Sequence, residues 1–207
     1  MGSVFIIEDH PVSRLAVRMV LENEGYEVIG ETDNGVDGMR LARELDPRLV
    51  ILDISLPRLD GLEVLARIQA MGMPWRVLVL TAQASELFAI RCMQLGAAGY
   101  VSKVEDLTEL LSAVRAVFAG YTYFPSQALA AADDPERGAE LRLFQQVNDR
   151  ELMVLQLFAQ GRTNREIAEG MFLSNKTVST YKKRLMHKLK AKSLVELLEI
   201  AKRNGVV

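Results

Sequence analysis

The stretch LVILDISLP, residues 49–57, decides the fold and raises the first question about this chain. Its four leading apolar residues are typical of a strand that is buried on both faces, as in the middle of a parallel sheet. A single carboxylate, Asp53, then ends the run, and Pro57 follows four residues later. The rest of the sequence has to explain why so apolar a strand ends in a negative charge.

Strand and helix patterns alternate on both sides of this stretch, over the first 124 residues. Short apolar or alternating runs predict strands, and segments with helical spacing of apolar residues predict a helix after each strand. The predicted strands are 4–7, 26–32, 49–52, 76–81 and 99–102, and the predicted helices are 10–25, 34–46, 59–72, 85–96 and 106–120. Successive βα units of this kind predict an α/β fold with a doubly wound, five-stranded parallel sheet, whose ligands bind at the carboxyl ends of the strands.

Polar side chains fall at the carboxyl ends of four predicted strands. Glu8 and Asp9 follow the first strand and Asp53 follows the third, while Thr81 ends the fourth and Lys103 follows the fifth. Carboxylates gathered at one edge repel one another unless a cation neutralises them, and Mg²⁺ prefers such oxygen ligands. The sequence therefore predicts a magnesium site beside a lysine and a hydroxyl donor. Ordinary solvated strand ends would explain any one of these residues, but they explain the whole set poorly.

Four motifs in this part resemble those of response-regulator receiver domains: IIEDHP (6–11), LVILDISLPRLDG (49–61), VLT (79–81) and GYVSK (99–103). The resemblance implies that Asp53 is the phosphoacceptor. It also implies that Glu8, Asp9 and the backbone carbonyl of Ser55 hold Mg²⁺ together with Asp53. The charge at the tip of the apolar strand is then a nucleophile, positioned for in-line attack on a phosphoryl donor.

The same resemblance assigns the remaining polar residues of the site. Thr81 and Lys103 are expected to contact the phosphoryl group, and Thr81 and Tyr100 to form the switch that responds to it. Pro57 and Gly61 are expected to shape the loop after the phosphoacceptor.

Two alternative interpretations of the site stay open. Dehalogenase-like phosphatases also place an aspartate at a strand end, but they need a second one two residues later, where this chain has Ser55. We therefore expect no enzyme. A degenerate receiver that is never phosphorylated would not need the complete set of polar residues found here.

The charge of the chain is unevenly divided. Residues 1–124 carry 17 acidic and 11 basic residues, whereas residues 145–207 carry 6 acidic and 12 basic residues. A basic end on an acidic body indicates a polyanionic partner for that end, although a solvated lysine and arginine surface is the simpler alternative. With the linker-like composition between them, these differences predict a receiver domain over 1–122, a linker over 123–144 and a small all-α domain over 145–207.

The basic end shows only helical patterns, over about 149–160, 163–170, 175–190 and 194–203. A short second helix, a tight turn and a long basic third helix predict a helix-turn-helix. Good capping residues stand before each helix: Asn148 or Asp149, Thr163 with Glu166, Ser174, and Ser193 with Glu196.

The third of these helices is basic and amphipathic. Val178, Leu185 and Leu189 form its predicted core face, with Tyr181 at the edge. The opposite face is predicted to carry Lys176, Ser179, Thr180, Lys182, Lys183 and Arg184. A basic amphipathic helix can also lie on a membrane, but small hydroxyl residues between lysines favour contacts in a DNA groove.

Residues 148–189 resemble the LuxR/FixJ-type DNA-binding domain. The resemblance implies base contacts from Ser179, Thr180 and Lys183, and phosphate contacts from Lys176, Thr177, Lys182 and Arg184. Glu151 corresponds to a residue that holds the fold. The family's opening is usually Leu-Thr-x-Arg-Glu; this chain has VNDRE, and Asp149 is taken to replace the threonine as the cap.

Together the motifs identify the chain as similar to NarL/FixJ two-component response regulators. Within that family it is similar to the BvgA/EvgA-like branch, which regulates virulence and stress genes. Four segments carry this second resemblance: GETDNG (30–35), GYTYFPS (120–126), FLSNKTVSTYK (172–182) and SLVELLEIAKRN (193–204). The implied partners are double-stranded promoter DNA, a sensor histidine kinase or its phosphotransfer domain, a second copy of the chain and, as a further candidate, RNA polymerase. The receiver is expected either to pair through its fourth and fifth helices or to release the C-terminal domain, and helix 194–203 is expected to form a dimer contact. The sequence shows no secretory signal, no membrane insertion and a single cysteine, Cys92, so a cytoplasmic location is expected.

Overall fold

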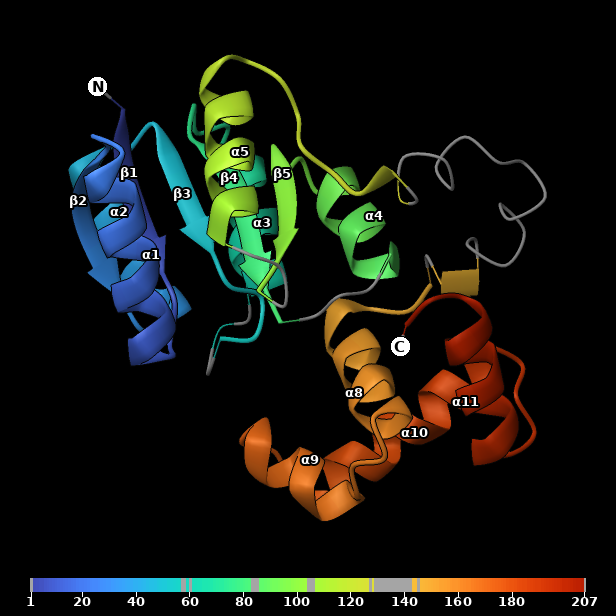
Figure 1. Ribbon diagram of the computed structural model, residues 1–207. Helices are drawn as coiled ribbons and strands as arrows, with labels where there is room; N and C mark the ends of the chain where they lie inside the picture. Colours follow the sequence, from blue (N-terminus) through green and yellow to red (C-terminus); the bar gives the residue numbers. More distant parts are fainter. Residues whose placement is uncertain are drawn as a thin grey trace. The chain divides into compact units, whose positions relative to one another are not determined.

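The computed structural model of the chain describes residues 2–56, 59, 61–82, 86–103, 107–126, 128, 143–144 and 146–206. The chain divides into two compact units, one formed by nearly all residues up to Pro125 and the other mainly by those from Ser126 onward (Figure 1). Pro57, predicted to shape a loop, and Ser85, the first residue of a predicted helix, lie outside the described residues, as does most of the predicted linker.

The first unit contains the predicted parallel sheet. Its strands are β1 (Ser3–Ile7), β2 (Glu27–Thr32), β3 (Leu49–Leu52), β4 (Arg76–Thr81) and β5 (Gly99–Ser102), in the order β2-β1-β3-β4-β5. The chain first moves outward from β1 to β2 and then crosses to β3 on the other side. The switch point of the topology therefore lies between β1 and β3, where doubly wound folds bind their ligands.

A helix follows each strand, as predicted: α1 (Pro11–Asn23), α2 (Gly35–Leu45), α3 (Gly61–Ala70), α4 (Glu86–Gln94) and α5 (Leu107–Phe118). Glycines follow the ends of four of them, because Gly25, Gly72, Gly96 and Gly120 adopt positive φ values that other residues disfavour. Asn34 caps α2 by accepting a hydrogen bond from the amide of Asp37 at 2.9 Å.

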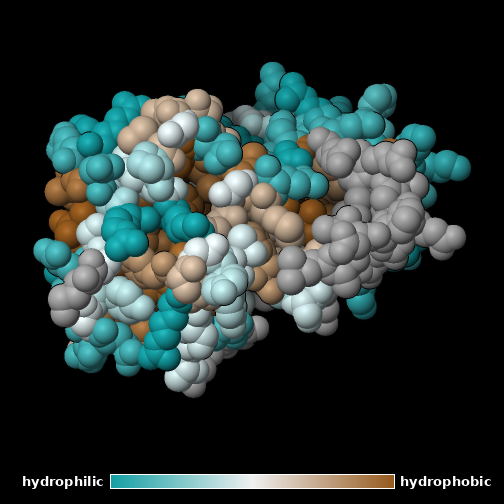
Figure 2. Space-filling view, turned by 90° about the horizontal axis from the view of Figure 1, so that it is seen from above, coloured by the Kyte–Doolittle hydropathy of each residue, from teal (hydrophilic) through white to brown (hydrophobic). Residues whose placement is uncertain are grey.

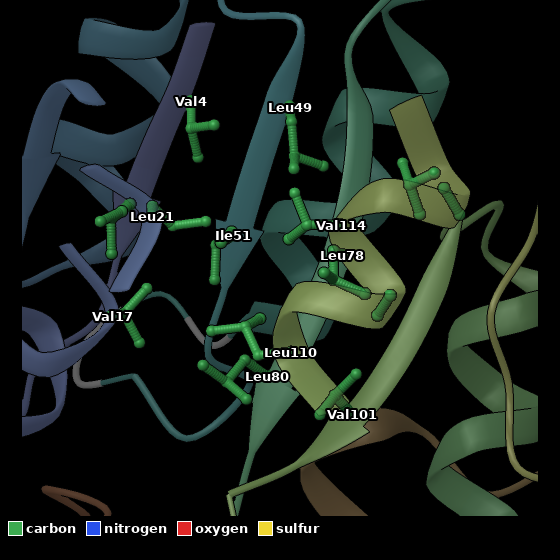
Figure 3. Close-up of a cluster of buried hydrophobic side chains, with 14 residues drawn as sticks. Val4, Val17, Leu21, Leu49, Ile51, Leu78, Leu80, Val101, Leu110 and Val114 are labelled. Atoms are coloured by element: carbon green, nitrogen blue, oxygen red, sulfur yellow. The ribbon is translucent and has the colours of Figure 1, made fainter. Parts of the chain in front are cut away.

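Apolar side chains from the sheet and from two helices form the core on one of its faces (Figure 3). Val4, Ile51 and Leu78 point from the strands toward Leu21 of α1 and Val114 of α5. Since side chains alternate along a strand, the residues between them are buried on the opposite face, including Phe5, Val50, Leu52, Val77 and Val79. This double burial explains why β3 is apolar throughout.

The second unit contains the four predicted helices: α8 (Asp149–Ala159), α9 (Asn164–Gly170), α10 (Asn175–Lys188) and α11 (Leu194–Arg203). Val178, Leu185 and Leu189 of the α10 segment are buried as predicted, and Tyr181 is half-buried at the edge. Packing of α8 and α9 against α10 gives the helix-turn-helix.

A polar side chain caps each helix of this unit. Asn148, not Asp149, caps α8, and it forms a complete capping box with Glu151, so Asn148 occupies the place of the family's threonine. Thr163 and Glu166 form the predicted box at α9. At α11, Ser193 accepts from the Glu196 amide, but the Glu196 carboxylate accepts from the amide of Lys192 rather than from that of Ser193.

The exposed surface carries both hydrophilic and hydrophobic residues. Figure 2 shows hydrophilic residues over much of one face, with hydrophobic areas between them. Large apolar side chains that remain exposed include Val12, Leu15 and Met19 of α1 and Val195 of α11. Among the helices of the described residues, none is both long enough and apolar enough to cross a membrane.

Candidate functional site

Three carboxylates meet at the carboxyl ends of β1 and β3, beside the switch point. One oxygen from each of Glu8, Asp9 and Asp53 lies within 4.8 Å of the others. Glu8 and Asp53 are buried, with 2% and 4% of their surface exposed, whereas Asp9 is exposed. Oxygen donors of this kind at such spacing fit a hard divalent cation, so the residues present suit the predicted Mg²⁺.

Backbone hydrogen bonds beyond the strand ends fix the positions of these side chains. The Asp53 amide donates to the carbonyl of Ile7 at 2.9 Å, and the Glu8 amide donates to that of Thr32 at 3.0 Å. Gly61, the first residue of α3, passes directly against this backbone, and a Cβ there would lie 2.5 Å from the Cα of Ile54. A side chain at position 61 would therefore displace the loop that carries Asp53.

Lys103 brings a positive charge to the cluster. Its ammonium lies 2.7 Å from Oδ2 of Asp53 and 2.6 Å from Oε2 of Glu8. Burial alone would lower the pKa of Lys103, but the two carboxylates outweigh it, and the pKa is raised above its usual value. Burial and the Asp53 carboxylate likewise raise the pKa of Asp9. The single charge of Lys103 does not balance three carboxylates, which favours a bound cation.

The first turn of α1 holds the Glu8 side chain in place, a feature that the sequence did not reveal. The His10 amide donates to Oε1 of Glu8 and the Ser13 hydroxyl donates to Oε2, each at 3.0 Å, and Arg14 donates to the Glu8 carbonyl at 2.6 Å. Because Glu8 lies before the helix, no local pattern in the sequence indicated its contact with Ser13. One carboxylate is therefore oriented by both a backbone and a side-chain donor.

The two candidate switch residues lie on β4 and β5. Thr81 is fully buried and Tyr100 is 2% exposed. The edge of β5 also carries a short addition, because Tyr123 donates its amide to Ala98 at 3.0 Å and accepts from the Tyr100 amide at 2.8 Å. Tyr123, the first residue of the predicted linker, is therefore joined to the sheet next to Tyr100.

The second group of predicted site residues lies along α10. Lys176, Thr180, Lys183 and Arg184 are exposed, and Thr177 and Ser179 are half-buried. Lys182 is also half-buried, and its ammonium lies 5.9 Å from the centre of the Phe158 ring of α8. Position 182 comes one helical turn after Val178 and one before Leu185, which places it at the border of the core face.

Two contacts of α10 join residues that are distant in the sequence. Asn164, at the start of α9, donates its side-chain amide to the Ser179 hydroxyl at 3.0 Å. Lys188 pairs with the fully buried Glu151 of α8 at 2.6 Å. Separations of 15 and 37 residues leave no local pattern from which these pairs could be predicted.

An acidic site at the switch point of a parallel sheet, followed by a basic helix-turn-helix, defines a phosphorylation-type signalling domain joined to a DNA-binding domain. Comparison with known families agrees: residues 4–115 match the response regulator receiver domain, and residues 146–201 match the bacterial regulatory proteins of the luxR family. The chain belongs to the response regulators with a LuxR-type DNA-binding domain, of the NarL/FixJ kind.

Its relatives span its whole length. It is 58% identical over 206 residues to the virulence factors putative positive transcription regulator BvgA of Bordetella pertussis, covering 99% of both chains. It is 32% identical over 204 residues to the DNA-binding transcriptional activator EvgA of Escherichia coli, again covering 99% of both. A structure of Salmonella RcsB, bound to promoter rprA in the presence of the phosphomimetic BeF₃⁻, aligns with a TM-score of 0.67 and 26% identity, covering 97% of this chain and 98% of that one.

Proposed function

We propose that this response regulator is a transcription factor whose DNA binding is controlled by phosphorylation of Asp53. The observation that carries the proposal is the buried Asp53 carboxylate beside two further carboxylates and the Lys103 ammonium. A carboxylate in such a place can attack a phosphoryl group whose developing charge is neutralised by a metal ion and a lysine.

Each polar residue of this site has a distinct role in the proposal. Glu8, Asp9, Asp53 and the carbonyl of Ser55 hold Mg²⁺, which neutralises phosphate oxygens when bound. Lys103 moves from the carboxylates toward the phosphoryl group that Asp53 acquires. Thr81 donates its hydroxyl to the same group, and its movement is sensed by Tyr100 on the neighbouring strand.

The proposed DNA interface is the exposed side of α10. Ser179, Thr180 and Lys183 read base edges, while Lys176, Thr177 and Arg184 contact phosphates. The basic excess of residues 145–207 supplies the general attraction to DNA. Lys182, which the sequence assigned to the phosphates, contacts Phe158 in this structure and is the weakest member of the set.

The proposed function requires further partners. A sensor histidine kinase or its phosphotransfer domain supplies the phosphoryl group, and two copies of the chain bind two half-sites as a homodimer. Leu194 and Val195 of α11 are exposed at 37% and 66%, which suits a contact between copies. BvgA and EvgA are named as transcriptional regulators, and we extend to this chain the control of virulence, surface or stress genes, with RNA polymerase as a further partner in the cytoplasm.

The decisive experiment is phosphorylation of the purified protein by a small phosphodonor with and without Mg²⁺, read on a phosphate-affinity gel. We expect a shifted band that requires both Mg²⁺ and Asp53, so that it is absent from Asp53→Asn. Asp33 and Asp46 are exposed and lie outside the carboxylate cluster. Of these two, Asp33 serves as the matched control, and we expect Asp33→Asn to keep the band. A band that persists in Asp53→Asn would contradict the assignment of the phosphoacceptor.

A further inference from the structure

The contact between Asn164 and Ser179 links the two helices of the helix-turn-helix at a polar point. Asn164 is the first residue of α9, and Ser179 lies in the second turn of α10. Both side chains are half-buried, although Thr163 and Arg165 next to Asn164 are exposed. The contact is thus built into the packing of α9 against α10, and the 3.0 Å distance is that of a good hydrogen bond.

The direction of this hydrogen bond decides what the Ser179 hydroxyl can offer. The side-chain nitrogen of asparagine only donates, whereas a serine hydroxyl has one hydrogen and two lone pairs. Ser179 accepts from Asn164, so one lone pair is occupied and its hydrogen has to point elsewhere. The hydrogen of the Ser179 hydroxyl is therefore left to donate to a second partner.

The neighbouring hydroxyls on the same side of α10 are used differently. Thr180 donates to the carbonyl of Lys176 at 2.9 Å, within the helix. Thr177 shares a 2.8 Å hydrogen bond with Ser174, the cap of α10. Among these three hydroxyls, the one on Ser179 accepts a hydrogen bond from a residue of the other helix.

We propose that Asn164 is a positioning residue for DNA recognition: it orients the Ser179 hydroxyl so that Ser179 donates a hydrogen bond to an acceptor atom of a base. The major groove offers such acceptors as purine N7, guanine O6 and thymine O4, and a hydroxyl held as a donor disfavours the amino groups of adenine and cytosine. This inference rests on the proposed DNA interface and adds a residue of α9 that the sequence did not single out.

A double-mutant cycle on sequence discrimination tests the inference. The full-length protein, with Mg²⁺ and beryllofluoride as phosphoryl mimic, first selects its operator from a pool of random duplexes. The quantity measured is the ratio of its affinities for the operator and for an unrelated duplex. We expect Asn164→Ala and Ser179→Ala each to lower this ratio about three- to tenfold, the value of one hydrogen bond, and the double variant to be no worse than Ser179→Ala alone.

A merely structural role or a phosphate contact gives a different pattern. In either case Asn164→Ala lowers the affinities for both duplexes equally, or its effect adds to that of Ser179→Ala, and both results overturn the inference. Arg165→Ala is the control, because exposed Arg165 pairs with Glu169 on its own helix and is expected to leave the ratio unchanged.

Asn164→Asp covers the case in which the alanine variant does not fold, as judged by circular dichroism. Its carboxylate accepts instead of donating, so it keeps the contact but turns the Ser179 hydrogen away from the DNA. We expect a lowered ratio here too, and a wild-type ratio would overturn the claim about direction. Failure of the wild-type protein to select any sequence would instead refute the proposed function itself.

Discussion

At the residue scale, Glu151 shows how much one side chain contributes to the DNA-binding unit. It is fully buried, and its Oε2 accepts from the Asn148 amide at 2.9 Å and from the Lys188 ammonium at 2.6 Å. One carboxylate therefore caps α8 and also holds the last turn of α10. A buried ion whose partner is removed is strongly destabilising, because the remaining charge is left uncompensated.

Replacing Lys188 should expose this dependence. We expect Lys188→Met to lower the opening free energy of α8 and α10 by about 2–4 kcal/mol, somewhat less than for a fully buried pair because Lys188 is 27% exposed. Amide hydrogen exchange of the two helices measures this free energy, with the receiver helices as internal reference.

Exposed Lys192→Ala is the matched control and should change little. Adding Glu151→Gln to Lys188→Met should restore part of the loss, and unchanged protection in Lys188→Met would refute the argument.

At the element scale, local patterns predicted the five strands and nine helices named above for the described residues. Alternation along β2, the continuous apolar run of β3 and the capping residues of α9 and α10 are properties of neighbouring residues, which a sequence shows directly. Lys182 lies between Val178 and Leu185 at the border of the core face, so its charge and its helical position indicate different surroundings. Contacts across elements, such as those of Ser13, Asn164 and Lys188, depend on packing and could not be predicted.

The two neighbouring lysines of α10 therefore make a matched pair. Lys183 is exposed, whereas the ammonium of Lys182 lies over the Phe158 ring. Log K for DNA binding falls linearly with the logarithm of the salt concentration. Removing one cationic side chain that contacts a phosphate or a base edge reduces this slope by about one unit. We expect Lys183→Ala to show this reduction and Lys182→Ala to leave the slope nearly unchanged, with a stability loss of about 0.5–1 kcal/mol instead. Equal slopes for the two variants, measured by titrations at several salt concentrations, would contradict this distinction.

At the scale of the whole molecule, the motifs predicted the carboxylate site and the helix-turn-helix but not how the chain leaves the first unit. Tyr123, counted as linker in the sequence, pairs with the edge of β5, and its hydroxyl donates to Glu109 of α5 at 3.2 Å. Pairing of this kind joins residues more than twenty positions apart and has no local signature. It places the start of the connection to the DNA-binding unit beside Tyr100, the candidate switch residue.

Gly99 makes this pairing possible. A Cβ on Gly99 would lie 2.9 Å from the Tyr123 carbonyl oxygen and 2.7 Å from Cδ1 of buried Leu78, so Gly99→Ala should push the Tyr121–Phe124 segment off β5. Allosteric coupling between two sites is typically worth about 1–3 kcal/mol. We expect Gly99→Ala to lose most of the increase in DNA affinity that beryllofluoride produces in the wild-type protein.

The controls separate a loss of coupling from damage to the phosphorylation site. Gly99 begins β5 and Lys103 follows its other end, so Gly99→Ala should still be phosphorylated on Asp53. Tyr123→Phe, which lacks only the hydroxyl bonded to Glu109, should retain the wild-type response. Hydrogen exchange at residues 121–126 reports whether the segment has left the strand. The contradicting outcome is a Gly99→Ala protein in which residues 121–126 exchange freely but beryllofluoride still raises the DNA affinity in full. The pairing with β5 would then be absent while the coupling persisted. The signal would therefore reach the DNA-binding unit without the pairing of Tyr123 with β5.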